Sequence, residues 1–287
     1  MDYSKFCEIL NKYIFEGEKR ELLKKIADHP ERFIGLFRPS KPGTKILQHL
    51  LQSHEIRFGD ALEKLIEEIL KGLGYLILPK SITTANGEQL SLDQFFTDGK
   101  NYYFIEQKIR DDHDSTKKRG QIANFEAKLE ELFKIYENKL IGIMYFTDPD
   151  LMKNKNFYIN ELNRLKEYYK VPLYLFYGKE LFEFLQSSDY WEKLINWLIK
   201  WKGSLPEMPD INFDTKPQES FEEIKDLEIR YWRKLLENKK LWEEGIIRAI
   251  FRSGETLKLI LNYFLAQTSA PYQRLSTLLK ERLKEYY

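Results

Sequence analysis

The chain has one cysteine, Cys7, among its 287 residues, so an internal disulfide bond is excluded. Its four histidines show no His-X-X-X-His spacing, and with a single cysteine a zinc site is not expected. No apolar run reaches the roughly 18 residues of a membrane span, and no charged-then-apolar signal segment follows Met1. A glycine-rich phosphate loop is missing, which argues against ATP-driven translocation. These absences predict a cytoplasmic protein that does not associate with membranes.

Charge of either sign is not in excess, because 46 Lys and Arg residues face 45 Asp and Glu residues, with a formal net charge of +1. This balance does not exclude a polyanionic partner, since positive groups can line one cleft while acidic residues cover other surfaces. Hydrophobic residues make up 43% of the chain, which is ample for the core of one elaborated domain or of two smaller ones.

The most informative pattern is a β-hairpin expected over residues 91–108. An Asp-Gly pair at 98–99 separates two apolar runs, which is a strong hairpin signal. Glu106 and Lys108 are two residues apart on the second strand, so their side chains project from the same face. Asp93 opens the first strand. We therefore expect these three charged side chains to meet at one end of the hairpin.

Two carboxylates and an ammonium group are the side chains that phosphodiester hydrolysis requires. Mg²⁺ prefers oxygen ligands and keeps several of its waters, so Asp93 and Glu106 with a phosphate oxygen would make a reasonable site. Lys108 would orient the attacking water and neutralise the negative charge that develops in the transition state. The alternative is a solvated hairpin whose charged residues have no catalytic role.

A dense polar segment at residues 109–121 follows the hairpin and has almost no apolar content. Side chains of these types pair with phosphates and with base edges in the major groove. We predict a DNA-contacting loop here, and a free, solvated loop is the alternative. The expected contact residues are Arg110, Asp112, His113, Asp114, Ser115, Thr116, Lys117, Lys118, Arg119 and Gln121.

Over about residues 55 to 185, the sequence resembles the type II restriction endonucleases built on the PD-(D/E)XK nuclease core. Asp93 and the Glu106-X-Lys108 motif carry the resemblance, although Leu92 stands where the motif often has proline. The upstream helix adds Glu63, at a place where this family often has a supporting acidic residue. The resemblance implies Asp93 and Glu106 as Mg²⁺ ligands and Lys108 beside the attacking water.

The resemblance further implies sequence-specific cleavage of double-stranded DNA. A palindromic target would require a homodimer, and the host genome would require a partner DNA methyltransferase to protect its own sites. The same hairpin motif occurs in repair and recombination nucleases, so a structure-specific nuclease is one alternative. A non-catalytic DNA-binding protein is another.

The rest of the sequence predicts an α/β fold, with a mixed central sheet flanked by helices and a C-terminal helical subdomain. Apolar strands at 139–146 and 173–177 enclose a helical segment at 158–169, which is the alternation that such a sheet needs. Residues 1–30 have the spacing of one amphipathic helix. The expected regions are an N-terminal helical region (1–43), the nuclease core (44–203) and a C-terminal helical subdomain (204–287) that follows a proline-containing linker.

Overall fold

The computed structural model describes residues 1–35, 37, 39–84 and 86–286. The chain forms two compact units, one built from Met1–Tyr13 and Phe58–Leu205 and the other from Ile14–Arg57 and Pro206–Tyr287. Helix α3 (Pro42–Gly72) contributes residues to both units. None of the described helices combines the length and the apolar character needed to cross a membrane.

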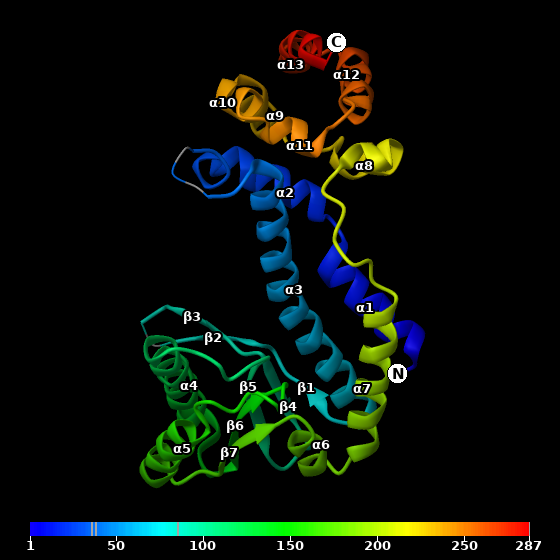
Figure 1. Cartoon of the computed structure of the whole chain (residues 1–287). Coiled ribbons are helices and arrows are strands. Elements are labelled where there is room, and N and C mark those ends of the chain that lie inside the picture. The colour runs from blue at the N-terminus through cyan, green and yellow to red at the C-terminus, as the bar shows by residue number, and fades with distance from the viewer. Residues whose placement is uncertain (36, 38, 85, 287) are drawn as a thin grey trace. The chain divides into compact units, whose positions relative to one another are not determined.

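Within the described residues, the first unit contains a five-stranded mixed sheet with the order β1-β4-β5-β6-β7 (Figure 1). Strands β1, β4 and β5 pair antiparallel, whereas β5, β6 and β7 are parallel. Aromatic and aliphatic residues dominate these strands, which is typical of strands covered on both faces. The strands are β1 (Leu76–Ile77), β4 (Gln94–Thr97), β5 (Tyr102–Lys108), β6 (Leu140–Phe146) and β7 (Leu173–Tyr177).

Helices α4 (Ser115–Tyr136) and α5 (Lys155–Tyr169) lie on the same side of this sheet (Figure 1). Their apolar stripes and the strand residues that face them form one buried cluster. Burying a large apolar side chain contributes about 1.5–3 kcal/mol, so this cluster is a main source of stability in the unit. Its members include Phe104, Phe125, Leu129, Met144, Phe146, Tyr158 and Leu162.

The C-terminal half of α3 contacts side chains of the strands that point away from α4. The amide nitrogen Nε2 of Gln94 on β4 donates to the backbone oxygen of Glu63 on α3, at 2.6 Å. Just after α3, the ring of Tyr75 packs edge-on against the rings of Phe96 and Tyr103. The sheet therefore has helical cover on both faces, which confirms the predicted α/β fold.

The remaining elements of the first unit are short or lie beside the sheet. A separate antiparallel hairpin pairs Ser81 with Ser91 and Thr83 with Gln89. These elements are α1 (Tyr3–Phe15), whose last two residues belong to the second unit, β2 (Ser81–Thr83), β3 (Gln89–Ser91), the 3-10 turn Glu137–Lys139, α6 (Glu180–Phe184) and α7 (Ser188–Gly203).

Helices alone form the second unit within its described residues, as the C-terminal pattern predicted. Apolar side chains from α2, such as Leu23 and Ile26, share one buried cluster with Trp232, Ile260 and Phe264 of the C-terminal helices. The helices are α2 (Glu18–Asp28), α8 (Pro217–Ile224), α9 (Ile229–Glu237), α10 (Lys239–Glu243), α11 (Ile246–Ile250), α12 (Glu255–Ala266) and α13 (Ala270–Leu283), with 3-10 turns at Pro30–Arg32, Phe213–Thr215 and Lys284–Tyr286.

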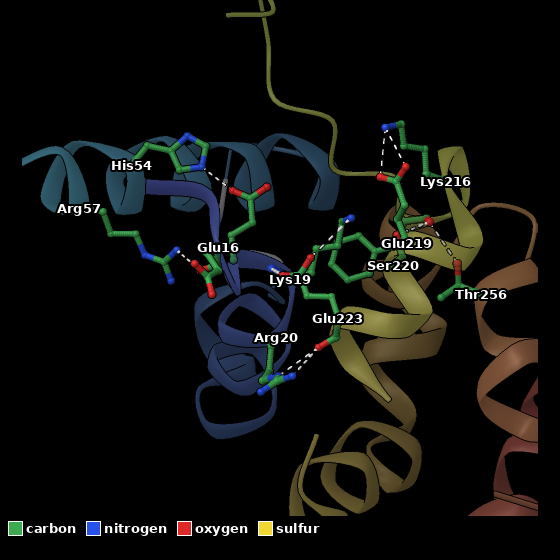
Figure 2. A network of polar contacts seen from close by, with 12 residues as sticks. Glu16, Lys19, Arg20, His54, Arg57, Lys216, Glu219, Ser220, Glu223 and Thr256 are labelled. Atoms are coloured by element: carbon green, nitrogen blue, oxygen red, sulfur yellow. Dashed lines mark hydrogen bonds and ion pairs between the residues drawn. The ribbon is translucent and has the colours of Figure 1, made fainter. Parts of the chain in front are cut away.

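Polar contacts join α2 to α8 within this unit (Figure 2). The backbone nitrogen of Lys19 donates to the Glu223 carboxylate at 2.8 Å, and the Arg20 guanidinium donates to the backbone oxygen of Glu223 at 2.9 and 3.1 Å. The imidazole of His54 lies 2.6 Å from the carboxylate of Glu18, which ties α3 to the start of α2. These contacts hold α2 against both α8 and the N-terminal half of α3.

The N-terminal prediction of one helix over residues 1–30 was wrong. The chain forms α1 and α2, separated by Gly17 at φ 72, which is the left-handed region that favours glycine. Both helices have apolar stripes, so the spacing alone looks continuous across the break.

Candidate active site

The three charged residues predicted to meet do lie together at the end of β5. The Lys108 ammonium is 2.8 Å from Oε1 of Glu106 and 3.0 Å from Oδ2 of Asp93. The backbone nitrogen of Gln107 also donates to Oδ2 of Asp93, at 2.7 Å. One ammonium group thus touches both carboxylates.

The register of the β4–β5 hairpin produces this arrangement. Gln94 pairs with Ile105, so Asp93, which immediately precedes Gln94, reaches the level of Glu106. The turn is closed by Asp98, whose Oδ1 accepts hydrogen bonds from the two backbone nitrogens at 100 and 101. Gly99 adopts φ 88 within this turn, a conformation that favours glycine.

Glu106 is almost fully buried, with 2% of its surface exposed. Burial alone would raise the pKa of its carboxyl group, but the ammonium groups of Lys108 and Lys128 outweigh burial and hold that pKa below its ordinary value. Lys128 on α4 contacts Oε2 at 2.5 Å, and the side-chain amide of Asn124 donates to Oε1 at 3.1 Å. Glu106 is therefore an anchored carboxylate.

Sequence reasoning missed Lys128 and Asn124. One signal for Lys128 was present, because the residue falls on the apolar stripe that includes Phe125 and Leu132, where an unpaired lysine would be costly. Asn124 is one helical turn before it, so both side chains come from the same face of α4.

Glu63 on α3 borders the same site. Burial, followed by the negative charge of Asp93, raises the pKa of the Glu63 carboxyl to about 8, while Lys108 and Lys80 act in the opposite direction. Removal of the carboxyl group from water is therefore the main reason for the raised pKa of Glu63, and the negative charge of Asp93 is the second. A cation bound near these carboxylates would favour the ionised form of Glu63.

The donor set fits a magnesium ion. Among the described residues, no group of three or more His, Cys, Asp or Glu side chains is arranged to hold a metal. Mg²⁺ does not need such a cage, because it is commonly bound through one or two carboxylates, with waters and substrate phosphates completing its shell. Asp93 and Glu106 already converge on one cationic group, the Lys108 ammonium. These two carboxylates are the residues that would hold the ion.

The predicted polar loop is shorter than expected. Strand β5 ends at Lys108 and helix α4 begins at Ser115, so the residues from Ser115 to Gln121 are helical. Asp114 caps the helix, since its carboxylate accepts from the backbone nitrogens of Thr116 and Lys117 at 2.9 Å each. The first turns of α4 lack apolar residues because they are largely exposed, and for that reason the sequence pattern resembled a loop.

Most of the predicted contact residues are accessible, and one is not. Gln121 is buried, and its Oε1 accepts a hydrogen bond from the Tyr158 hydroxyl. His113 is partly buried, and burial, together with the charge of Lys117, lowers the pKa of its imidazole below 6.5. Lys118 is also partly buried. The exposed members are Arg110, Asp112, Asp114, Ser115, Thr116, Lys117 and Arg119.

Asp111 lies in the middle of this segment and was not among the predicted contact residues. Its carboxylate is fully buried and accepts from the backbone and side-chain nitrogens of Asn154, at 2.9 and 2.8 Å. Asp111 also forms an isolated parallel β-bridge with Met152. The polar segment is therefore anchored to the chain that follows β6.

A search of curated proteins finds no match to the sequence. Among solved structures, the chain is similar to Can2 from Sulfobacillus thermosulfidooxidans in complex with cyclic tetra-adenylate, with 16% identity and a TM-score of 0.32. The match covers 69% of this chain and 54% of Can2, so the chain spans about half of the length of that protein.

A family model gives the decisive match. The model of the type II restriction endonuclease HinfI matches residues 2–88 and 76–202, which is more than half of the chain. The predicted resemblance to type II restriction endonucleases is thus confirmed. The chain belongs to the HinfI family of type II restriction endonucleases, a family of deoxyribonucleases.

Proposed function

We propose that this protein is a Mg²⁺-dependent endonuclease that hydrolyses phosphodiester bonds of double-stranded DNA at a specific sequence. The observation that carries the proposal is the convergence of Asp93 and Glu106 on the ammonium group of Lys108. Membership of the HinfI family supports the same activity.

Each side chain has a distinct role in this proposal. Asp93 and Glu106 hold the divalent ion, which, when bound, supplies Lewis-acid stabilisation of the phosphate and a more acidic water. Lys108 orients the attacking water and offsets negative charge on the phosphate oxygens in the transition state. Glu63 is a supporting carboxylate whose charge state changes with the local positive charge.

The accessible start of α4 and the segment before it form the proposed DNA-contacting surface. Lys117 is exposed there, and Arg119 follows two residues later on the same helix. Backbone N–H groups at a helix N-terminus also favour phosphate. Cations of this surface would hold phosphates, while the neutral side chains and carboxylates would read base edges.

The proposal extends to the assembly and the cellular setting. A palindromic site would be cut by a homodimer, in which each protomer cleaves one strand. A cognate methyltransferase would protect the host DNA, and both proteins would act in the cytoplasm.

The test is digestion of unmethylated phage DNA by the purified protein, with Mg²⁺ and with EDTA. Discrete fragments that require Mg²⁺ are expected from the wild type, and end sequencing of these fragments gives the site. Asp93→Asn and Lys108→Ala are expected to abolish cleavage. Lys134→Met is the matched control, because Lys134 pairs with Glu131 on the exposed face of α4.

The other outcomes decide between the alternatives. A Mg²⁺-dependent smear, insensitive to base substitutions in the target, would favour a structure-specific repair or recombination nuclease. Intact DNA under every condition would leave a non-catalytic DNA-binding protein as the better account.

A further inference from the structure

Lys128 is a second lysine in contact with the Glu106 carboxylate, and the proposed mechanism gives it no role. Only 4% of the Lys128 surface is exposed. Its ammonium group lies 2.5 Å from Oε2 of Glu106, and the two residues are far apart in the chain, one on α4 and the other on β5.

Stability alone does not account for a lysine at this place. Removing an ammonium group from water is expensive, and replacing a buried ion pair by well-packed apolar residues is often neutral or stabilising. The neighbouring stripe positions of α4, Phe125 and Leu129, are apolar and fully buried. An aliphatic residue at position 128 alone would leave the buried Glu106 carboxylate without this partner, so Lys128 serves Glu106 and not the apolar packing around it.

The two oxygens of Glu106 have different partners. Lys128 binds Oε2, whereas Oε1 accepts from Asn124 and faces Lys108, which in turn contacts Asp93. With Oε2 held from α4, rotation of the carboxylate is restricted and Oε1 stays on the side of Asp93. Oε1 of Glu106 and a carboxylate oxygen of Asp93 then face the same point, where one ion would bind.

We propose that Lys128 is a positioning residue of the active site, which holds Oε2 of Glu106 so that Oε1 and Asp93 together bind the divalent ion. This inference rests on the proposed metal-dependent function. Lys128 acts through its hydrogen-bonded contact with Oε2 and not through its positive charge, because a nearby positive charge by itself repels a divalent ion.

The two effects of removing Lys128 have opposite signs, which makes the role measurable. Loss of repulsion would tighten binding of a divalent ion. Loss of the contact would weaken binding, because Glu106 would then be held only through Oε1, by Lys108 and Asn124, and Oε2 could move. Outer-shell partners of metal ligands typically contribute about 10- to 100-fold in metal affinity. We therefore expect the Lys128→Met variant to bind the ion at least about 10-fold more weakly than the wild type.

The experiment measures Mn²⁺ binding to the full chain without DNA, from the electron paramagnetic resonance signal of the free ion. Mn²⁺ takes the same carboxylate and water ligands as Mg²⁺. Asp93→Asn replaces one of the two proposed ligands, so its Mn²⁺ affinity gives the value expected when a direct ligand is lost. Lys134→Met removes an exposed lysine from the same helix and is expected to match the wild type.

Lys128→Gln is the second variant, and it is used if circular dichroism shows that Lys128→Met does not fold. The Lys128→Gln side chain is one bond shorter than lysine, so it does not reach Oε2 with Glu106 in its present place, and the same loss of affinity is expected. Wild-type or tighter Mn²⁺ binding in whichever variant is folded overturns the proposal, because a purely structural lysine would leave the ion affinity unchanged.

DNA digestion separates this inference from the proposed function. If the wild type cuts DNA and the folded Lys128 variant keeps wild-type Mn²⁺ affinity, the nuclease function holds and the role of Lys128 is refuted. If the wild type cuts no DNA while the Mn²⁺ affinity falls as expected in the variant, the nuclease function fails and Lys128 remains a positioning residue of a metal site.

Discussion

The hydroxyl group of Tyr177, at the end of β7, donates a hydrogen bond of 2.9 Å to the carboxylate of Asp111. Burial, and then this contact with Asp111, raises the pKa of the Tyr177 hydroxyl, which keeps it a donor. Two nitrogens of Asn154 donate to the same carboxylate. Asp111 therefore joins three segments of the first unit at one buried point.

Replacing this carboxylate should destabilise the protein strongly. In Asp111→Ala, the Tyr177 hydroxyl and the two Asn154 nitrogens lose their common acceptor, and an unsatisfied buried donor costs about 1–3 kcal/mol. We expect the free energy of unfolding to fall by roughly 3 kcal/mol, measured by urea denaturation monitored with circular dichroism.

Asp112→Ala is the matched control, because the neighbouring Asp112 is exposed. Its free energy of unfolding should stay within about 0.5 kcal/mol of the wild type. Equal stability of the two variants would show that Asp111 is not an anchor.

Glu63 should make the stability of the protein depend on pH. Its pKa is about 8 in the folded chain, against an ordinary value of 4.5, so the folded state binds a proton that the unfolded state has released between these values. The wild type therefore loses stability relative to Glu63→Gln as pH rises from about 4.5 to about 8. Thermal unfolding of both proteins at pH 4, 6 and 9, without divalent ions, measures the difference.

Glu67, one helical turn further along α3, provides a comparison of opposite sign. Burial would raise the pKa of its carboxyl, but hydrogen bonds from Lys64, Lys71 and Lys80 lower it to about 2. The ionised form thus stabilises the fold above pH 4.5, and this contribution is lost as pH falls toward 2. Glu67→Gln should therefore melt below the wild type at neutral pH, whereas Glu63→Gln should melt above it.

The basic start of α4 should make DNA binding depend on salt. Lys117 is exposed, so Lys117→Ala should weaken DNA binding at every sequence tested and reduce the slope of log affinity against log salt by about 1. Fluorescence anisotropy between 50 and 200 mM NaCl, in EDTA, measures this slope. Lys134→Ala, on an exposed face of the same helix, should leave it unchanged, and equal slopes in all three proteins would remove Lys117 from the DNA surface.

A side chain at Gly142 on β6 should destabilise the fold. A Cβ atom there would lie 2.7 Å from Cδ2 of Leu173 and 2.7 Å from the ring of Phe104, closer than real Cβ contacts. Because Phe104 is on the same face of β5 as Glu106, the strain would act next to the active site. Gly142→Ala should lose about 1–3 kcal/mol of stability in urea denaturation. Gly203→Ala has open space around it and should be close to neutral.

The sequence was sufficient for the part of the site that local rules determine. An Asp-Gly turn and the two-residue period of a strand bring Asp93, Glu106 and Lys108 together, and the structure has the hairpin with that register. The strand Leu173–Tyr177 was also expected at its observed bounds. Turn formation and the alternation of a strand depend on a few neighbouring residues, so a single sequence is enough to predict them.

Contacts between distant segments were not predictable in the same way. The pairing of Lys128 with Glu106 and of Asn154 with Asp111 joins residues far apart in the chain, and no spacing rule connects them. An apolar stripe shows which face of a helix is buried, but it does not show which element packs against that face. The packing of α2 with α9 could therefore not be inferred. The start of α4 was missed because an exposed helical turn has no apolar period.

The anchoring of Asp111 has an evolutionary consequence. The exposed residues 112, 114–117 and 119 lie between two fixed points, the buried Asp111 and the apolar stripe of α4 that begins at Ile122. Substitutions between these points can alter the chemistry offered to a partner without displacing Glu106 or Lys108. A lineage of such proteins could therefore acquire new target preferences while the geometry that breaks the bond is inherited unchanged.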